Sequence, residues 1–194
     1  MNRNPIVPFT TRFERAWQSL AISRWWSLAL LTVGTASNVM YAHTPLVAFA
    51  VVSGITLQWR RASAIAVLIW LVNQSVGFGL RGYPLSVTAL SWGALMGLGT
   101  LLVALYASWR PSFARTFWTG YVLWWAIALL VGFVLYQGLI LLVYPLMADG
   151  HWMDWAIIAK LLAKNLAWAG TLAIVHGLFL WHQLVTAPLV QPRL

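Results

Sequence analysis

The sequence contains no cysteine, which excludes disulfides, thiolate nucleophiles and cysteine-ligated metal sites. Charge is scarce as well. Only 8% of the 194 residues are charged and 3 are acidic, whereas a soluble domain carries about 25% charged residues. Because 61% of the residues are hydrophobic and the mean hydropathy is +0.79, the chain cannot cover a surface in water. We therefore predict an integral membrane protein.

The sequence also lacks residues and motifs that several classes of transporter and enzyme need. No predicted span contains Asp or Glu, which disfavours proton- or sodium-coupled carriers. The sequence also lacks a G-x-x-x-x-G-K-[ST] motif for nucleotide hydrolysis, a Ser-His-Asp constellation and a metal-ligand cluster. We predict that the protein is not an enzyme and has no resident cofactor. The net charge of +9 does not indicate nucleic-acid binding, because the arginines lie at loop ends.

The apolar runs predict an all-α bundle. A membrane-spanning helix needs roughly 17–25 mostly apolar residues, and we expect six such spans in one transmembrane domain covering residues 1–194. Their approximate limits are 25–42, 46–59, 62–80, 85–109, 116–147 and 155–181. The second is the shortest. The first 24 residues have no apolar core typical of a signal peptide, so the first span should remain in the membrane.

The lead segment of residues 1–24 should contain a short amphipathic helix. In the sequence TTRFERAWQSLA (residues 10–21), Thr11 and Glu14 fit a capping box. Phe13, Trp17 and Leu20 fall on one helical face. We expect this helix to lie on the inner membrane surface, although a plain cytoplasmic lead-in would fit as well.

Arginine placement predicts the orientation. Four arginines precede residue 25, and those at positions 60, 61, 110, 115 and 193 fall on the same side of the predicted bundle. Arg81 alone lies on the other side, with Asp149 and Asp154. The positive-inside rule then places both termini in the cytoplasm of a bacterial inner membrane protein.

Polar residues inside the spans share one depth. Counting along each span at about 1.5 Å per residue puts them in the outer half of the membrane, where they could line a pocket that opens outward. With the aromatic residues nearby, the predicted substrate-binding residues are Asn73, Gln74, Tyr83, Gln137, Tyr144, Lys160, Lys164 and Trp168.

Each of these groups also has a structural interpretation. Of Asn73 and Gln74, one should face the ligand and the other should lock the helix, because neighbouring side chains point about 100° apart. Lys160 and Lys164 share a helical face and could offset the charge of an anionic ligand. They could equally extend to the outer interface.

Two stripes of small residues permit close helix contact. One consists of Ala89, Gly93 and Gly97, and the other of Ala159, Ala163 and Ala167. Both favour packing within the bundle. They could instead dock a partner subunit, which would make the protein a membrane assembly or interaction factor without a soluble ligand. A membrane enzyme acting on a lipid or quinone is a third, weaker alternative.

The predicted architecture resembles the S-components of energy-coupling-factor (ECF) vitamin transporters, which are small substrate-binding membrane proteins that use a separate ATPase module. The stretch VNQSVGFGLRGYPLSVTALSWGALMG, from residue 72, further resembles the solitary BtuM-like group linked to vitamin B12. The residues that carry this resemblance are Asn73, Gln74, Gly77, Phe78, Tyr83, Pro84, Trp92 and Gly93.

The resemblance implies capture of a vitamin from the periplasm, namely cobalamin or a related corrinoid. Expected partners are the lipid bilayer, the vitamin and an ECF-type energising module or another membrane subunit. The sequence departs from these families in two ways. The cysteine that ligates cobalt in BtuM-like proteins is missing, and the first span lacks the Ala-xxx-Ala pattern of other S-components, although Thr32 and Ala36 are small and four apart.

Overall fold

The computed structural model describes residues 11–41, 44–147 and 154–186, and the regular elements in these ranges are all helices. They are α1 (Arg12–Ala21), α2 (Arg24–Met40), α3 (Leu46–Thr56), α4 (Trp59–Ser75), the π-helix η1 (Val76–Leu80), α5 (Val87–Ala107), α6 (Ser112–Thr116), α7 (Trp118–Met147) and α8 (Trp155–Thr186). The all-α prediction is confirmed for the described residues.

Within the described ranges, four helices are long and apolar enough to cross a membrane: Trp59–Leu80, Val87–Ala107, Trp118–Leu146 and Trp155–Thr186. They correspond to the last four predicted spans. The first predicted span forms α2, whose 17 residues reach about 25 Å. The second forms α3, which ends at Thr56 and has 11 residues, or about 16 Å of helix. This is too short to cross the bilayer alone.

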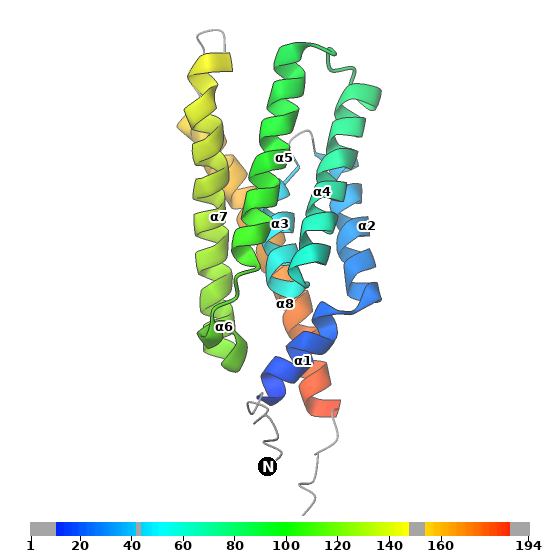
Figure 1. Ribbon diagram of the computed structural model, residues 1–194, viewed down its shortest axis with the longest axis vertical. Helices are drawn as coiled ribbons and strands as arrows, with labels where there is room; N and C mark the ends of the chain where they lie inside the picture. The colour runs from blue at the N-terminus through cyan, green and yellow to red at the C-terminus, as the bar shows by residue number, and fades with distance from the viewer. Residues whose placement is uncertain (1–10, 42–43, 148–153, 187–194) are drawn as a thin grey trace, which may run out of the picture.

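The helices run alternately up and down the bundle, as the colour sequence in Figure 1 shows. The first and last described helices, α1 and α8, have their outer ends at the same end of the molecule, here called the terminal end. The η1–α5 connection and the C-terminal end of α7 lie at the opposite end, here called the distal end. Both ends of the described chain therefore lie at the same end of the bundle.

Helix starts follow from local capping. The hydroxyl groups of Thr11, Ser23 and Ser86 accept hydrogen bonds from backbone N–H groups three residues on, at 3.1, 3.3 and 3.2 Å. Such N-caps satisfy donors that a helix start otherwise leaves without a partner. The capping residue predicted at Thr11 is therefore present in the structure.

Helix α3 occupies the centre of the bundle. All 11 of its residues are buried, and it packs against α4, α5, α7 and α8. Gly54 permits the closest approach, because a Cβ there would lie 2.5 Å from the carbonyl oxygen of Ala104 and 2.6 Å from the Cβ of Ala107. The uninterrupted apolar sequence LVAFAVV of α3 is suited to this position, since no side of the helix meets water.

Both ends of α3 are satisfied by side chains from other parts of the chain. At its start, Asn165 Oδ1 of α8 accepts a hydrogen bond from the Ala48 amide at 2.8 Å. At its end, the Trp17 indole donates to the Ile55 carbonyl at 3.1 Å, and Arg110 Nε donates to Gly54 at 3.1 Å. Each such group left buried without a partner would cost about 1–3 kcal/mol.

Helix α1 has the predicted amphipathic pattern but covers protein with its apolar face. Phe13, Trp17, Leu20 and Ala21 are buried, and the helix packs against α8, α6 and α3 at the terminal end of the bundle. The apolar face of α1 thus packs on the bundle, and the position of the helix at the inner membrane surface stays a prediction. The Trp17 hydrogen bond to α3 explains why the bundle holds this helix.

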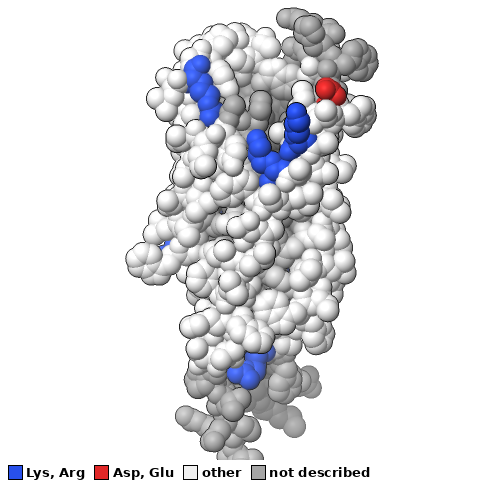
Figure 2. Space-filling view, turned by 180° about the vertical axis from the view of Figure 1, so that it is seen from behind, with Lys and Arg blue, Asp and Glu red and all other residues white. Residues whose placement is uncertain are grey.

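Charged side chains gather toward the ends of the molecule. On the face shown in Figure 2, Lys and Arg lie mainly in the upper part and at the lower end, with a broad, almost uncharged band between them. Large apolar side chains are exposed on the long helices, including Leu102, Val134 and Leu178 at 46%, 67% and 63%. Exposed apolar surface of this kind is expected where helices face lipid.

The close packing of α3 against α5 predicts that Gly54→Ala is destabilising. Its new methyl group would overlap Ala104 and Ala107, and overpacking of a core costs about 1–3 kcal/mol. The matched control is Gly170→Ala in α8, where a Cβ would meet nothing within 4 Å and should be neutral or stabilising by up to ~1 kcal/mol. Thermal unfolding in detergent measures both. Equal midpoints for the two variants would contradict the central, tightly packed position of α3.

Candidate ligand-binding pocket

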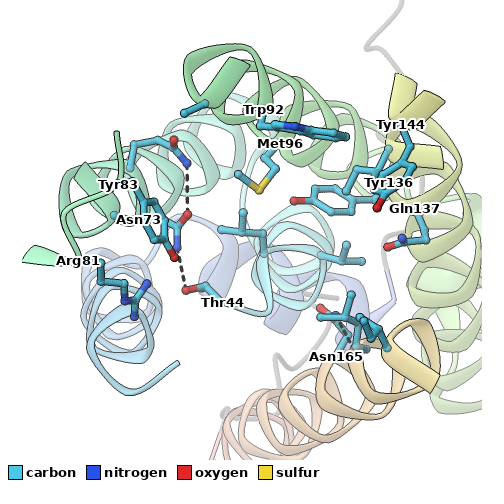
Figure 3. A pocket seen from close by; sticks show the side chains of 18 of the residues that line it. Thr44, Asn73, Arg81, Tyr83, Trp92, Met96, Tyr136, Gln137, Tyr144 and Asn165 are labelled. Atoms are coloured by element: carbon cyan, nitrogen blue, oxygen red, sulfur yellow. Dashed lines mark hydrogen bonds between the residues drawn. The ribbon is translucent and has the colours of Figure 1, made fainter. Parts of the chain in front are cut away.

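A cavity of about 500 Å³ lies beyond the start of α3, between α4 with η1, α5, α7 and α8 (Figure 3). Because α3 begins only at Leu46, the space that a longer helix would fill stays open between its neighbours. The lining consists of Thr44, Leu46, Val47, Asn73, Gln74, Gly77, Phe78, Arg81, Tyr83, Pro84, Ala89, Trp92, Met96, Phe133, Tyr136, Gln137, Ile140, Tyr144, Ile157, Leu161 and Asn165. Tyr83 and Pro84 are exposed, so the cavity reaches the molecular surface at the η1–α5 connection.

A network of amides forms one side of the cavity. Asn73 Nδ2 donates to Asn38 Oδ1 at 2.9 Å and to Thr44 Oγ1 at 3.0 Å, and Thr44 also donates to Asn38. Asn38 Nδ2 in turn donates to Gly34 and Ile69 carbonyls at 3.1 and 3.4 Å. The network ties α2, the α2–α3 connection and α4 together, so it fixes the position of Asn73.

Gln74 ends this network and reaches toward α5. Its Nε2 donates to Asn73 Oδ1 at 3.2 Å, and its Oε1 lies where a Cβ on Gly93 would be 2.4 Å away. Among the described residues, none donates a hydrogen bond to Oε1 of Gln74. Asn73 is therefore the amide that locks the helices, and Gln74 is the amide with acceptor capacity left over.

The π-helix η1 follows directly after the two amides. Arg81 N–H donates to the Val76 carbonyl at 3.0 Å, which is the i→i−5 spacing of a π-turn. This wider turn changes the face that the following residues present. Gly77, Phe78 and Tyr83 then line the cavity, and the Tyr83 ring lies against Gly77, where a Cβ would be 2.9 Å from Cδ2.

Aromatic rings and a second pair of amides form the opposite side. Tyr136, Gln137 and Tyr144 of α7 and Asn165 of α8 face the cavity in Figure 3. The Trp92 ring of α5 lies 6.0 Å from the Tyr144 ring, inclined by 55°. Gln137 and Asn165 are both buried. The cavity thus has polar groups on two sides and flat rings between them.

Two cations, Arg81 and the predicted site residue Lys164, lie at the end of α2. Arg81 lines the cavity, but its Nη2 donates to the carbonyls of Asn38 and Tyr41 at 2.6 and 2.7 Å, and Figure 3 shows it reaching over α2. Lys164 Nζ lies 4.8 Å from the centroid of the Tyr41 ring. Both cations lie near the C-terminus of α2, where the negative end of the helix dipole stabilises positive charge.

Five of the eight predicted site residues line the cavity: Asn73, Gln74, Tyr83, Gln137 and Tyr144. The other three, Lys160, Lys164 and Trp168, do not. Lys160 is exposed, and the Trp168 ring packs 5.5 Å from Phe49 and 6.3 Å from Tyr41. On α8 the residues that line the cavity are Ile157, Leu161 and Asn165. The last two each follow a predicted lysine by one residue, so the lining face is rotated by about 100° from the predicted face.

Sequence reasoning missed several lining residues. Asn165 is a polar residue at the predicted depth, so its polarity was a usable signal, and Trp92 belongs to the stretch that carries the family resemblance. Thr44, Met96 and Tyr136 gave no comparable signal, because small hydroxyls, methionines and aromatic rings are common in apolar helices of any role.

The chemistry of the lining favours an uncharged or weakly anionic ligand. Among the described lining residues no carboxylate occurs, and the one cation, Arg81, is engaged with α2. Within the described part of the chain, no group of three or more His, Cys, Asp or Glu residues could hold a metal ion. Amide and tyrosine groups can bind carbonyls, amides and heteroaromatic nitrogens.

No family model, curated protein or solved structure matches this chain. The resemblance to ECF S-components therefore stays a prediction, and the function is inferred from the cavity itself.

The geometry predicts that Ile140 faces water and its neighbour Leu141 faces lipid. Since the natural chain has no cysteine, Ile140→Cys and Leu141→Cys each introduce one reactive thiol at almost the same depth of α7. A charged, membrane-impermeant thiol reagent should label Ile140→Cys, because thiolate forms only in contact with water. Leu141, which is 38% exposed on the outside of the helix, should stay unlabelled after substitution.

Labelling of both variants in membranes, or of Leu141→Cys alone, would contradict a water-accessible cavity in this position.

Proposed function

We propose that this protein is a membrane transport protein that captures a small vitamin-like ligand from the outer side of a bacterial inner membrane for uptake. The observation that carries this proposal is the cavity of about 500 Å³ with polar groups on two sides and aromatic rings between them. Its volume lies in the range of about 300–1,000 Å³ that is typical of small-molecule sites.

The proposal includes a six-span topology with both termini in the cytoplasm. The four long apolar helices would each cross the membrane once, and α2 would add a fifth pass. The sixth pass would consist of α3 and the cavity beyond its start, which gives an even number of passes. The cavity would then face the periplasm, opposite the arginine-rich terminal end. Arginines at positions 60, 61, 110 and 115 near the terminal end support this orientation through the positive-inside rule.

Ligand recognition would divide between the two polar sides. Gln74 has acceptor capacity left and would accept a hydrogen bond from an amide or ring N–H of the ligand. Gln137 would bind a polar group on the other side, and the rings of Trp92 and Tyr144 would cover a flat part of the ligand. Asn165 would not take part, because both of its polar groups are bonded within the protein. No residue is assigned a catalytic role.

The resemblance to BtuM-like proteins points to cobalamin or a related corrinoid as the ligand. A corrinoid carries amide groups around a flat macrocycle, which suits amide and aromatic partners. It is, however, much larger than the drug-sized molecules that a cavity of this volume encloses. We therefore propose that the cavity takes up either one part of a corrinoid or the whole of a smaller heteroaromatic vitamin.

The test is binding of a vitamin panel, including cobalamin, to the purified protein by titration calorimetry. Gln74→Ala should weaken binding of the recognised ligand by about 3- to 10-fold, since one hydrogen bond contributes about 0.5–1.5 kcal/mol. Gln74 makes a single hydrogen bond within the described chain, so this substitution should leave the fold intact.

Lys160→Gln is the matched control, because Lys160 is exposed and does not line the cavity. Its binding constant should equal that of the natural protein. Absence of binding by any vitamin, or an equal loss in the control, would contradict the proposal.

A membrane assembly or interaction factor is the second candidate. The stripe of Gly93 and Gly97 does not support it, because Gln74 and Trp70 of α4 occupy that surface. The stripe on α8 does, since Ala159, Ala163 and Ala167 are all exposed. A partner helix on that stripe would be detected by photo-crosslinking from position 163 in membranes, and the vitamin panel would then give no binding.

A further inference from the structure

A second recess, of about 570 Å³, lies at the terminal end of the bundle, away from the ligand cavity. Helix α1, the α3–α4 junction, the α5–α6 connection and α6 form its walls. Three arginines line it, at positions 60, 110 and 115, together with one acid, Glu14, and three tryptophans, at positions 17, 59 and 109. The recess therefore carries an excess of positive charge.

Arg110 lines this recess and is held in place by two contacts. Its Nε donates to the Gly54 carbonyl at 3.1 Å, and its Cζ lies 5.9 Å from the Trp17 ring centroid. Among the described residues no other hydrogen bond to this guanidinium occurs, so its two terminal nitrogens remain available. Its backbone has a φ of 43°, a conformation that costs energy for any residue except glycine and that is found preferentially at functional sites.

The neighbouring charges do not balance. Arg115 Nη1 lies 3.4 Å from Glu14 Oε1, which pairs one arginine with the one acid of the recess. Burial, and to a smaller extent the charge of Arg115, lowers the pKa of Arg110 to about 10. Arg110 is thus still cationic at neutral pH, next to a second cation, and an anion between them would relieve the repulsion.

Exposed tryptophans place the recess at the level of lipid headgroups. Trp59 is 56% exposed and Trp109 is 77% exposed, and Trp25, at the start of α2 on the same end of the bundle, is 82% exposed. Tryptophan is enriched where the membrane meets water, because its ring is apolar and its N–H is polar. Arg60 Cζ also lies 5.2 Å from the Trp59 ring.

We propose that this recess binds the phosphate-bearing headgroup of an anionic membrane lipid. Arg110 would donate to the phosphate from its terminal nitrogens, with Arg60 and Arg115 on either side. Trp59 and Trp109 would contact the glycerol and upper acyl region. The bound lipid would fix α1 and the α5–α6 connection against the end of α3, which these segments already cap.

The test uses the full-length protein in nanodiscs of equal parts phosphatidylglycerol and phosphatidylcholine, followed by native mass spectrometry of the lipids retained after transfer to detergent. The natural protein should retain phosphatidylglycerol in preference to phosphatidylcholine. The double variant Arg60→Gln/Arg115→Gln should lose this preference by roughly 25-fold, at about 5-fold for each charge near the membrane surface. Both residues are exposed, and Arg110, which caps α3, is left in place.

Arg15→Gln is the matched control. It removes an exposed arginine from α1 that does not line the recess, and retention should be unchanged. A loss in this control equal to that in the double variant, or no preference for phosphatidylglycerol in the natural protein, would overturn the proposal. Inorganic phosphate is tested separately on lipid-free protein. Binding with the same arginine dependence would identify a site for free phosphate and would overturn the lipid assignment.

Discussion

The structure depends on the burial of one short helix whose terminal polar groups bond to side chains from other parts of the chain. Helix α3 is buried over all 11 residues, and its terminal polar groups meet Asn165, Trp17 and Arg110. In an apolar environment unsatisfied backbone groups are costly, so these three side chains fix where α3 begins and ends. Because they come from α8, α1 and the α5–α6 connection, α3 also determines how the outer helices are arranged.

The ligand cavity follows from this constraint. The long helices of the bundle extend beyond the start of α3. Their side chains line the space between them but do not fill it. The amide network of Asn38, Thr44 and Asn73 holds α2 and α4 together beside that space, while Arg81 satisfies the last carbonyls of α2. Most polar groups near the cavity thus stabilise the helices, while Gln74 keeps acceptor capacity for a ligand.

The sequence predicted the helical class and the amides well, because apolar runs and polar residues at a shared depth are direct consequences of the membrane as a solvent. Five of eight predicted site residues line the cavity. The three that do not line it lie on α8, where the sequence predicts the face of Lys160 and Lys164 as the cavity face. In fact that face is offset by one residue, since Asn165 must reach the start of α3. The depth of a residue in the membrane follows from its position along a span. The rotation of a helix about its own axis, in contrast, is set by contacts with residues distant in the chain. The packing of α1 on the bundle could not be read from the sequence for the same reason, because the acceptor for the Trp17 indole is the distant carbonyl of Ile55.

The central claim is that a water-accessible chamber exists above the buried start of α3. Hydroxyl-radical footprinting by X-ray radiolysis measures it most directly, because radicals form only where water is present and modify Met and Tyr side chains strongly. In the protein reconstituted in lipid, Met96 and Tyr136, which line the chamber from α5 and α7, should be modified at rates comparable to the exposed Tyr83. If Tyr83 is modified while Met96 and Tyr136 stay intact, the chamber is dry or closed, and the account is contradicted.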